Sequence, residues 1–256
     1  MSTLPQIDSH SFAFPSRDQA ANGEPDRPGR SPIDSAVAFN QLRRTFLSDI
    51  AALPRPSRGY FVTKRIIDLT IALIIGILVL PIALLIAIAI PINDRGAIFF
   101  RQQRTGLGGR RFTMLKFRTM CTNAEEMKAE LQHLSLVAYP DFKMDNDPRI
   151  TKVGKFLRAT FLDELPQLIN VIRGDMSLVG PRPTSFAAST YSLWHTERLE
   201  AKPGITGLWQ VRRGADETCL DERLRLDVEY LRTRSTSGDL KLLFETIGST
   251  IRRAGK

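Results

Sequence analysis

The stretch of this sequence best suited to chemistry lies at residues 158–183, RATFLDELPQLINVIRGDMSLVGPRP, where two acidic residues are adjacent. Asp163 and Glu164 have arginines on both sides, at positions 158, 173 and 182. Adjacent carboxylates repel each other unless a cation or nearby arginines offset them, and such hard oxygen ligands suit Mg²⁺ carrying a diphosphate. An Asp carboxylate can also attack phosphorus and form an acyl phosphate. The pair is therefore a candidate metal site and a candidate nucleophile for phosphate chemistry.

A structural interpretation of the same residues competes with the chemical one. Asp163 could cap a helix by accepting the free amides of its first turn, where Pro166 is tolerated, and Gly174 could end that helix. For an isolated acidic pair this interpretation would be the better one, and the nearby arginines shift the balance towards chemistry. The two interpretations are compatible, since the start of a helix also presents amide groups to a phosphate.

The element that precedes this stretch is an apolar segment, LTIALIIGILVLPIALLIAIAIPI, which contains no charged residue over Leu69–Ile92. Its length and composition indicate a bilayer helix. Pro81 lies in the middle, where it removes a backbone hydrogen bond and bends a helix. Both flanks are basic, and positive charge is typical of the cytoplasmic side, so we expect a re-entrant helix over residues 59–93 that breaks at Pro81 and returns to the same face. The flanking basic residues are Arg55, Arg58, Lys64, Arg65, Arg95, Arg101, Arg104, Arg110 and Arg111.

The segment before this helix, residues 1–58, contains seven prolines and has sustained periodicity only at 36–53. We expect a disordered tail with one labile helix, because such a composition buries too little apolar surface to offset chain entropy. The whole chain of 256 residues has a net charge of +9, which favours nucleic acid, acidic lipid or a phosphorylated substrate as partner. Its two cysteines, Cys121 and Cys219, are far apart and support neither a disulfide framework nor a zinc site.

Residues 94–256 are expected to form one domain at the cytosolic face. Two strand-like runs around TGLGG predict a hairpin at 97–120, and helical patterns follow at 122–135, 150–157, 185–201, 220–233 and 238–256. The last helix either packs in the core, which is the better default, or lies on anionic lipid. The predicted fold class is α+β and mostly helical, a membrane-associated monotopic domain with a small β-hairpin.

Three segments carry a resemblance to a known family. MLKFRTM at 114–120, DPRITKVGKFLRATFLDELPQLINVIRGDMSLVGPRP at 147–183 and KPGITGLWQV at 202–211 closely resemble the bacterial sugar transferases. These are monotopic phosphoglycosyl transferases that start exopolysaccharide, O-antigen or glycan assembly. The resemblance implies transfer of a sugar phosphate, here expected to be a hexose phosphate, from a UDP-sugar to undecaprenyl phosphate with release of UMP. It also implies Mg²⁺, a re-entrant helix broken at a proline, and the cytosolic face of the bacterial inner membrane. Dimers occur among relatives, and no nucleic-acid partner is expected.

Site residues are carried over by position from the family's motifs. Asp163 would be the nucleophile that takes the phosphosugar and also contacts the metal, and Glu164 would complete the metal site. Five residues would bind substrate or phosphate: Lys116, Arg118, Arg158, Arg182 and Asp227. Lys116 and Arg118 are two apart on an expected strand and so point to one face. The chain departs from the family's pattern after GLWQV, where RRGAD stands in place of a Gly-Arg pair whose arginine binds phosphate. Arg213 is the first candidate for that phosphate-binding arginine and Arg212 the second.

Two alternatives are left open by the sequence. A nucleotide-sugar hydrolase would use the same site with water as acceptor, and a basic membrane-tethered module would collect anionic lipid or nucleic acid by charge alone. The second would show steep salt dependence and indifference to Mg²⁺. The sequence does not identify the sugar, whose recognition we expect in the loops at 184–195 and 212–218.

Overall fold

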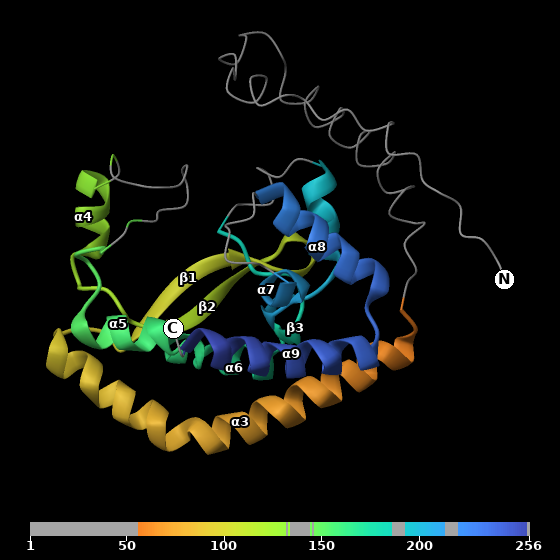
Figure 1. Ribbon diagram of the computed structural model, residues 1–256, viewed down its shortest axis with the longest axis horizontal. Coiled ribbons are helices and arrows are strands. Elements are labelled where there is room, and N and C mark those ends of the chain that lie inside the picture. The colour runs from red at the N-terminus through yellow and green to blue at the C-terminus, as the bar shows by residue number, and fades with distance from the viewer. Residues whose placement is uncertain are drawn as a thin grey trace, which may run out of the picture. The chain divides into compact units, whose positions relative to one another are not determined.

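The computed structural model describes residues 56–131, 133, 144, 146–185, 193–212 and 220–254 (Figure 1). The chain divides into two compact units, Met1–Thr45 and Phe46–Lys256, and only the second contains described residues. The predicted tail up to residue 55 and the candidate Arg213 therefore lie outside the described residues, as do most of the two loops expected to recognise the sugar.

The whole apolar segment lies in one long helix, α3 (Arg58–Asn93), which begins after Ser57. The side chain of Ser57 accepts a hydrogen bond from the backbone N–H of Tyr60 and so caps the helix. The helix continues through Pro81, so the predicted interruption of the helix is wrong, and Figure 1 shows a bend near the middle of a continuous helix. The return of the segment to the same membrane face stays a prediction. A proline bends a helix because it lacks an N–H and its ring clashes with the carbonyl four residues earlier.

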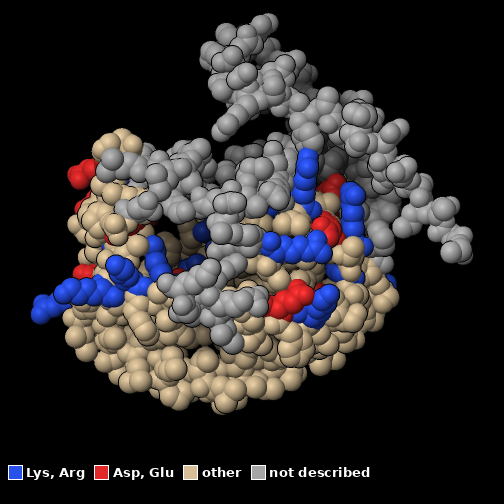
Figure 2. Space-filling model, in the orientation of Figure 1, with Lys and Arg blue, Asp and Glu red and all other residues tan. Residues whose placement is uncertain are grey.

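Both halves of α3 pack on the rest of the domain. In the first half Ala72 is fully buried in the main core, and in the second half Ile86 and Ile90 join a smaller cluster. The remaining surface of α3 is apolar and exposed, and the helix is long and apolar enough to cross a membrane. Figure 2 shows charged side chains above and an uncharged surface below, where α3 lies. The most exposed large side chains of α3 are Ile77, Leu78, Leu85 and Ile92.

The predicted hairpin is present. Strands β1 (Phe99–Thr105) and β2 (Arg111–Phe117) pair antiparallel, with Phe99 opposite Phe117, and are joined through a short 3₁₀ turn, η1 (Leu107–Gly109). The loop glycine Gly108 has a φ of 62°, a conformation that glycine adopts without a steric penalty.

The rest of the domain is mostly helical, as predicted. A second, two-stranded parallel sheet joins β3 to β4 and was not predicted from the sequence. The region expected to be helical at 185–201 is a 3₁₀ helix over its described part. In chain order the remaining elements are α4 (Ala124–Leu131), α5 (Lys152–Ala159), η3 (Leu162–Glu164), α6 (Gln167–Arg173), β3 (Ser177–Val179), η5 (Leu193–Glu200), β4 (Gly204–Thr206), α7 (Leu208–Arg212), α8 (Leu220–Thr233) and α9 (Thr236–Ala254).

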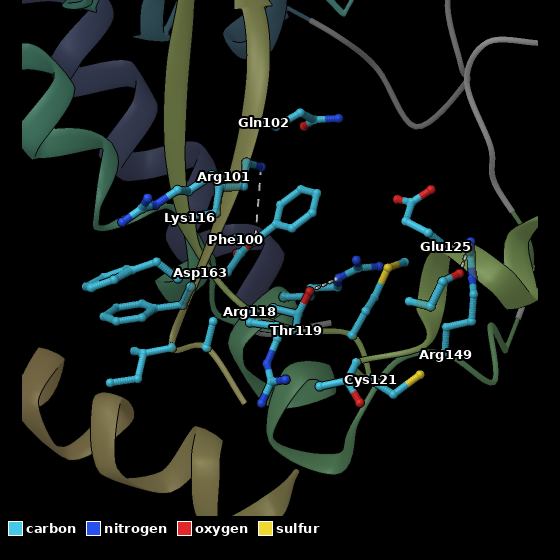
Figure 3. A pocket seen from close by; sticks show the side chains of 18 of the residues that line it. Phe100, Arg101, Gln102, Lys116, Arg118, Thr119, Cys121, Glu125, Arg149 and Asp163 are labelled. Atoms are coloured by element: carbon cyan, nitrogen blue, oxygen red, sulfur yellow. Dashed lines mark hydrogen bonds and ion pairs between the residues drawn. The ribbon is translucent and has the colours of Figure 1, made fainter. Parts of the chain in front are cut away.

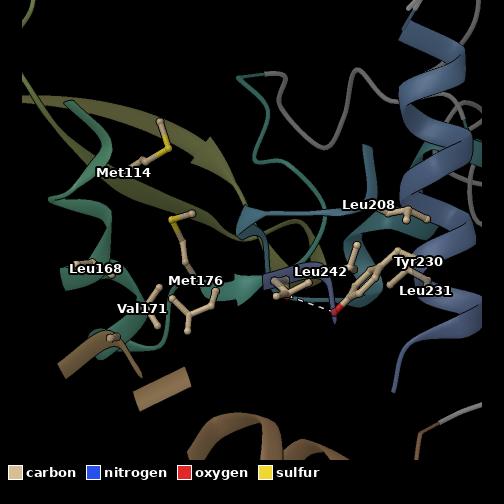
Figure 4. Close-up of a cluster of buried hydrophobic side chains, with 11 residues drawn as sticks. Met114, Leu168, Val171, Met176, Leu208, Tyr230, Leu231 and Leu242 are labelled. Atoms are coloured by element: carbon tan, nitrogen blue, oxygen red, sulfur yellow. Dashed lines mark hydrogen bonds between the residues drawn. The ribbon is translucent and has the colours of Figure 1, made fainter. Parts of the chain in front are cut away.

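The main core lies between α3, α6, α8 and α9 and one face of the hairpin (Figure 4). Val171 and Met176 are fully buried there, and Leu242 of α9 is also buried, which favours the core alternative for the last helix. Leu240, Phe244 and Ile247 of the same helix stay exposed, so α9 presents a second, outward apolar face.

Buried carboxylates attach α3 to this core. Asp68 accepts hydrogen bonds from the hydroxyl of Ser177 and the backbone N–H of Leu178. Asp239 accepts from the hydroxyl groups of Tyr60 and Tyr230. These bonds hold the first half of α3 against β3 and α9. They therefore also fix α3 relative to the elements that carry the acidic pair.

Candidate active site

The acidic pair lies in the 3₁₀ turn η3 and not at the start of a helix. Phe161, directly before this turn, has a φ of 58°, a left-handed conformation that is uncommon for a residue other than glycine. Helix α6 starts only after Pro166, so the prediction that Asp163 caps it is wrong, whereas Gly174 ends it with a φ of 89° as expected. The turn leaves Asp163 largely buried, with 9% of its surface exposed.

Lys116 is the cation closest to the pair. Its ammonium group is 2.7 Å from Oε1 of Glu164 and 4.0 Å from Oδ2 of Asp163. The lysine comes from β2 and the carboxylates from η3, which are 48 residues apart in the chain. One positive charge thus bridges both carboxylates and offsets their mutual repulsion.

Asn170 of α6 holds β2 in the position that Lys116 requires. Its side-chain amide donates to the carbonyl of Thr113 at 2.8 Å, and its Oδ1 accepts from the N–H of Leu115 at 3.0 Å. Asn170 is completely buried and occupies the open edge of the hairpin as a third strand would. The strand that carries Lys116 is therefore fixed to the helix that directly follows the acidic pair.

Arg158 lines the same cavity as Asp163 because α5 closely approaches the segment after β2. A Cβ atom on Gly154 would lie 2.0 Å from the carbonyl oxygen of Thr119, so only glycine fits this contact. The guanidinium of Arg158 donates to the hydroxyl of Thr119 at 2.9 Å and faces the same cavity as Asp163. The carboxylate of Asp163 favours the charged guanidinium, although burial lowers the pKa of Arg158.

Arg182 lies 3.9 Å from Oε1 of Glu164 and stacks over the ring of Trp209 at 5.8 Å. Asp227 does not reach the cavity that holds Asp163. It is buried 2.6 Å from Arg198, which in turn donates to the backbone carbonyl of Arg182. Asp227 and Arg198 therefore position the segment of Arg182. Arg173 ends α6, at the end of that helix farther from the pair.

Arg118 follows β2 and lines the cavity together with Lys116, as the shared face predicted. Its guanidinium is already engaged: it lies 3.3 Å from the carboxylate of Asp94 and donates to the backbone carbonyls of Asp94 and Arg95. Arg118 therefore also closes the end of α3, where a positive charge is favourable.

A cavity of about 1280 Å³, called the polar cavity below for its charged side chains, is lined by Lys116, Arg118, Arg158, Asp163 and Glu164 among others. Figure 3 shows Asp163 and Lys116 on one side and Glu125 and Arg149 on the opposite side, with Thr119 and Cys121 between them. Arg149, which sequence reasoning missed, is buried and held by Asp147 through two hydrogen bonds of 2.9 and 2.7 Å. The cavity exceeds the range of roughly 300–1,000 Å³ usual for ligand pockets. Its size and basic lining fit a large anion.

The two carboxyl groups of the pair differ in proton affinity. Burial raises the pKa of Asp163, and the nearby ammonium of Lys116 offsets this only in part. For Glu164 burial also raises the pKa, but Lys116 and Arg182 more than compensate, so its pKa is lowered. Glu164 is therefore the more firmly ionised of the two, and Asp163 the more basic, which is the property of the better nucleophile.

The donor set fits the usual mode of Mg²⁺ binding. In the part of the chain that the structure describes, no three His, Cys, Asp or Glu side chains are grouped as a metal cage. Mg²⁺ typically takes one or two carboxylates, with substrate phosphates and water completing its shell. Asp163 and Glu164 provide those two carboxylates beside a cavity large enough for a diphosphate.

Comparisons with known proteins identify the family of the chain. The family model for bacterial sugar transferases matches residues 59–253. The chain is 45% identical over 197 residues to the UDP-galactose-lipid carrier transferase of Erwinia amylovora, covering 75% of this chain and 41% of that protein. It is 42% identical over 190 residues to the galactosyl transferase CpsE of Streptococcus agalactiae, covering 74% and 42%. It is 41% identical over 207 residues to the UDP-glucose:undecaprenyl-phosphate glucose-1-phosphate transferase of Caulobacter vibrioides, covering 77% and 73%. The chain thus spans about two fifths of the first two relatives and about three quarters of the third.

Proposed function

Because this chain belongs to the bacterial sugar transferase family, we propose that it transfers a sugar 1-phosphate from a UDP-sugar to undecaprenyl phosphate and releases UMP, which starts the assembly of a polysaccharide. The observation that carries the proposal is the position of Asp163. This carboxylate is buried, of raised pKa, and faces a large basic cavity next to Lys116 and Arg158. A nucleophile for phosphorus and the cations to receive a diphosphate are thus in one place.

The reaction proceeds in two displacements. First, a carboxylate oxygen of Asp163 attacks the sugar-linked phosphorus, the bond from that phosphorus to the bridging oxygen breaks, and UMP leaves with the electron pair. Second, a phosphate oxygen of the lipid attacks the same phosphorus, the bond to Asp163 breaks, and the carboxylate is restored. The products are UMP and a lipid-linked sugar diphosphate.

The residues around Asp163 have distinct parts in this scheme. The ammonium of Lys116 and the guanidinium of Arg158 stabilise the charge on the transferring phosphoryl group. Glu164 orients Lys116 through the 2.7 Å contact. Mg²⁺, when bound at the two carboxylates, would neutralise the diphosphate and the departing UMP.

The names of the relatives point to the sugar class. The name of the Erwinia amylovora relative contains UDP-galactose, and that of the Caulobacter vibrioides relative contains UDP-glucose. Galactose and glucose are both hexoses. We therefore propose a hexose 1-phosphate as the transferred group. The exposed apolar surface of α3 supports a position in the cytoplasmic membrane, with the cavity at the level of the lipid headgroups on the cytosolic face.

The test offers a panel of radiolabelled UDP-sugars to the detergent-solubilised protein with Mg²⁺. Without acceptor we expect covalent label on the protein and release of UMP, and with undecaprenyl phosphate we expect labelled lipid. Asp163→Asn should abolish the protein label, because an amide is not a nucleophile for phosphorus. Label retained by this variant would refute the role of Asp163, and free sugar phosphate formed without any lipid product would indicate a hydrolase.

A further inference from the structure

A second cavity, of about 570 Å³, shares two wall residues with the polar one, Phe161 and Glu164. The rest of its lining is mostly apolar and comes from four separate regions of the chain. These lining residues include Ile71 and Ile75 of α3, Leu168 of α6, Ile205 of β4, and Leu240, Leu243, Phe244 and Ile247 of α9. Its volume lies within the range of roughly 300–1,000 Å³ that ligand pockets occupy.

The wall of this apolar cavity includes a cation. Arg182 lines it and does not line the polar cavity, and its guanidinium lies 3.9 Å from Glu164. The backbone of Arg182 is held by Arg198, whose charge is paired with Asp227. A positive charge in the wall of an apolar cavity matches a ligand that has an anionic head and a hydrocarbon tail.

The outer end opens onto the exposed apolar surface of the domain. Four of the lining residues, Ile75, Leu240, Phe244 and Ile247, are also exposed. Two of them, Phe244 and Ile247, have 73% and 58% of their surface accessible. In a membrane-bound protein this opening faces the lipid, so a chain could enter it from the bilayer.

We propose that this cavity holds the first isoprene units of the polyprenyl phosphate acceptor, with the phosphate at Arg182 and the rest of the chain in the bilayer. The inference rests on the proposed function and adds the acceptor's binding site to it. The shared wall at Glu164 favours the acceptor over a structural phospholipid, because only the acceptor must bring its phosphate to the phosphorus carried by Asp163. That phosphate oxygen forms the new bond to phosphorus while the bond to the Asp163 carboxylate breaks.

Phe161 separates the two cavities, since its side chain lines both. Its left-handed backbone conformation, with a φ of 58°, is strained, and such strain persists where the surrounding structure imposes it. The same turn directs Asp163 into the polar cavity. Phe161 thus keeps the isoprenoid chain out of the donor's cavity.

The experiment compares two tryptophan substitutions on α3. Ile75→Trp fills the outer part of the apolar cavity, and 36% of the Ile75 surface is exposed, so the larger ring needs no rearrangement of the core. Ile77→Trp is the matched control: it lies on the same apolar helix, 71% exposed, and does not line the cavity. Both full-length variants are assayed in detergent for covalent labelling by UDP-sugar and for transfer to undecaprenyl phosphate.

We expect Ile75→Trp to leave covalent labelling unchanged and to raise the KM for undecaprenyl phosphate at least roughly tenfold, since even one methylene changes binding in an apolar pocket by that factor. Ile77→Trp should behave as wild type in both assays. An unchanged KM in Ile75→Trp, or an equal rise in Ile77→Trp, would overturn the assignment.

Two further measurements separate this inference from its alternatives. Geranyl phosphate, which has only two isoprene units, should lose affinity in Ile75→Trp as undecaprenyl phosphate does, and unchanged affinity would contradict the assignment. Phosphatidic acid should compete poorly with undecaprenyl phosphate in the wild type, and equal competition would mean that the cavity binds acyl chains generally. Absence of any covalent label on the wild-type protein would instead refute the proposed function, independently of the cavity.

Discussion

Replacement of Asn170 by alanine tests whether the fixed edge of the hairpin positions the catalytic groups. The side chain makes two hydrogen bonds to the backbone of β2 and is completely buried. Each bond is worth about 0.5–1.5 kcal/mol, and each buried group left without a partner costs about 1–3 kcal/mol. The N–H of Leu115 and the carbonyl of Thr113 both lose their partner, so we expect the free energy of unfolding to fall by about 2–6 kcal/mol.

A second effect is expected on chemistry. Lys116 follows Leu115 directly, and a displacement of about 1 Å in a positioned group can cost 10²-fold in rate. We expect the single-turnover rate of covalent labelling at saturating UDP-sugar to fall roughly ten- to hundredfold in Asn170→Ala, measured at a temperature where circular dichroism shows the folded protein. The combined Asn170→Ala and Lys116→Ala variant should be little slower than Lys116→Ala alone, because the asparagine acts through the lysine.

The matched control is Gln103→Ala on the same hairpin. Gln103 donates a 2.9 Å hydrogen bond to the hydroxyl of Thr113, but this bond is exposed, so its loss should change stability by no more than about 0.5 kcal/mol and leave labelling unchanged. A folded Asn170→Ala protein that labels at the wild-type rate would refute the positioning role. Additive losses in the double variant would show that Asn170 acts independently of Lys116.

Three more predictions concern buried charges. Burial raises the pKa of Asp163, so the folded protein binds this proton more tightly than the unfolded chain does, and the ionised carboxylate destabilises the fold. Covalent labelling should decline as pH falls towards the folded pKa of Asp163. At pH 7 the Asp163→Asn variant should melt at or above the wild-type Tm. Burial likewise raises the pKa of Asp227 to about 6, so the contribution of this group to stability falls as pH rises from about 4 to about 6. Asp227→Asn should remove that part of the Tm profile, and an unaltered profile would contradict the shift. Asp239 accepts hydrogen bonds from three donors, including the ammonium of Lys64 at 2.9 Å. Asp239→Ala should therefore lower the free energy of unfolding, measured by chemical denaturation, by about 3–5 kcal/mol. The control Lys241→Ala, which breaks an exposed pair on the same helix, should lower it by less than about 0.5 kcal/mol.

Local pattern was sufficient for the elements whose structure depends on nearby residues. The uncharged run became α3, and the glycine-rich turn between two strand-like runs became the β1–β2 hairpin. The pattern was insufficient where the chain conformation is imposed by distant contacts. The three-residue strands β3 and β4 are too short to show a period, and they form because Ser177 and Gly204 meet across the core.

The cap interpretation of Asp163 failed for a similar reason. The residues DELPQL are typical of a helix start, but Phe161 takes a left-handed conformation that no sequence rule assigns to phenylalanine. The aromatic ring is held between two cavities, and the turn that follows is 3₁₀. Propensity is a weak preference that tertiary packing overrides at such a position.

By itself the sequence determined the long apolar helix, the acidic pair and the family, because each depends on contiguous residues. Only the tertiary structure decided which basic residues reach the pair. Lys116 reaches it because Asn170 joins segments 55 residues apart, and Arg158 faces the same cavity because Gly154 allows α5 to touch Thr119. Arg173, although close in sequence, is carried away by α6. Contacts between distant segments follow from packing and burial, which a local pattern of residue types does not encode.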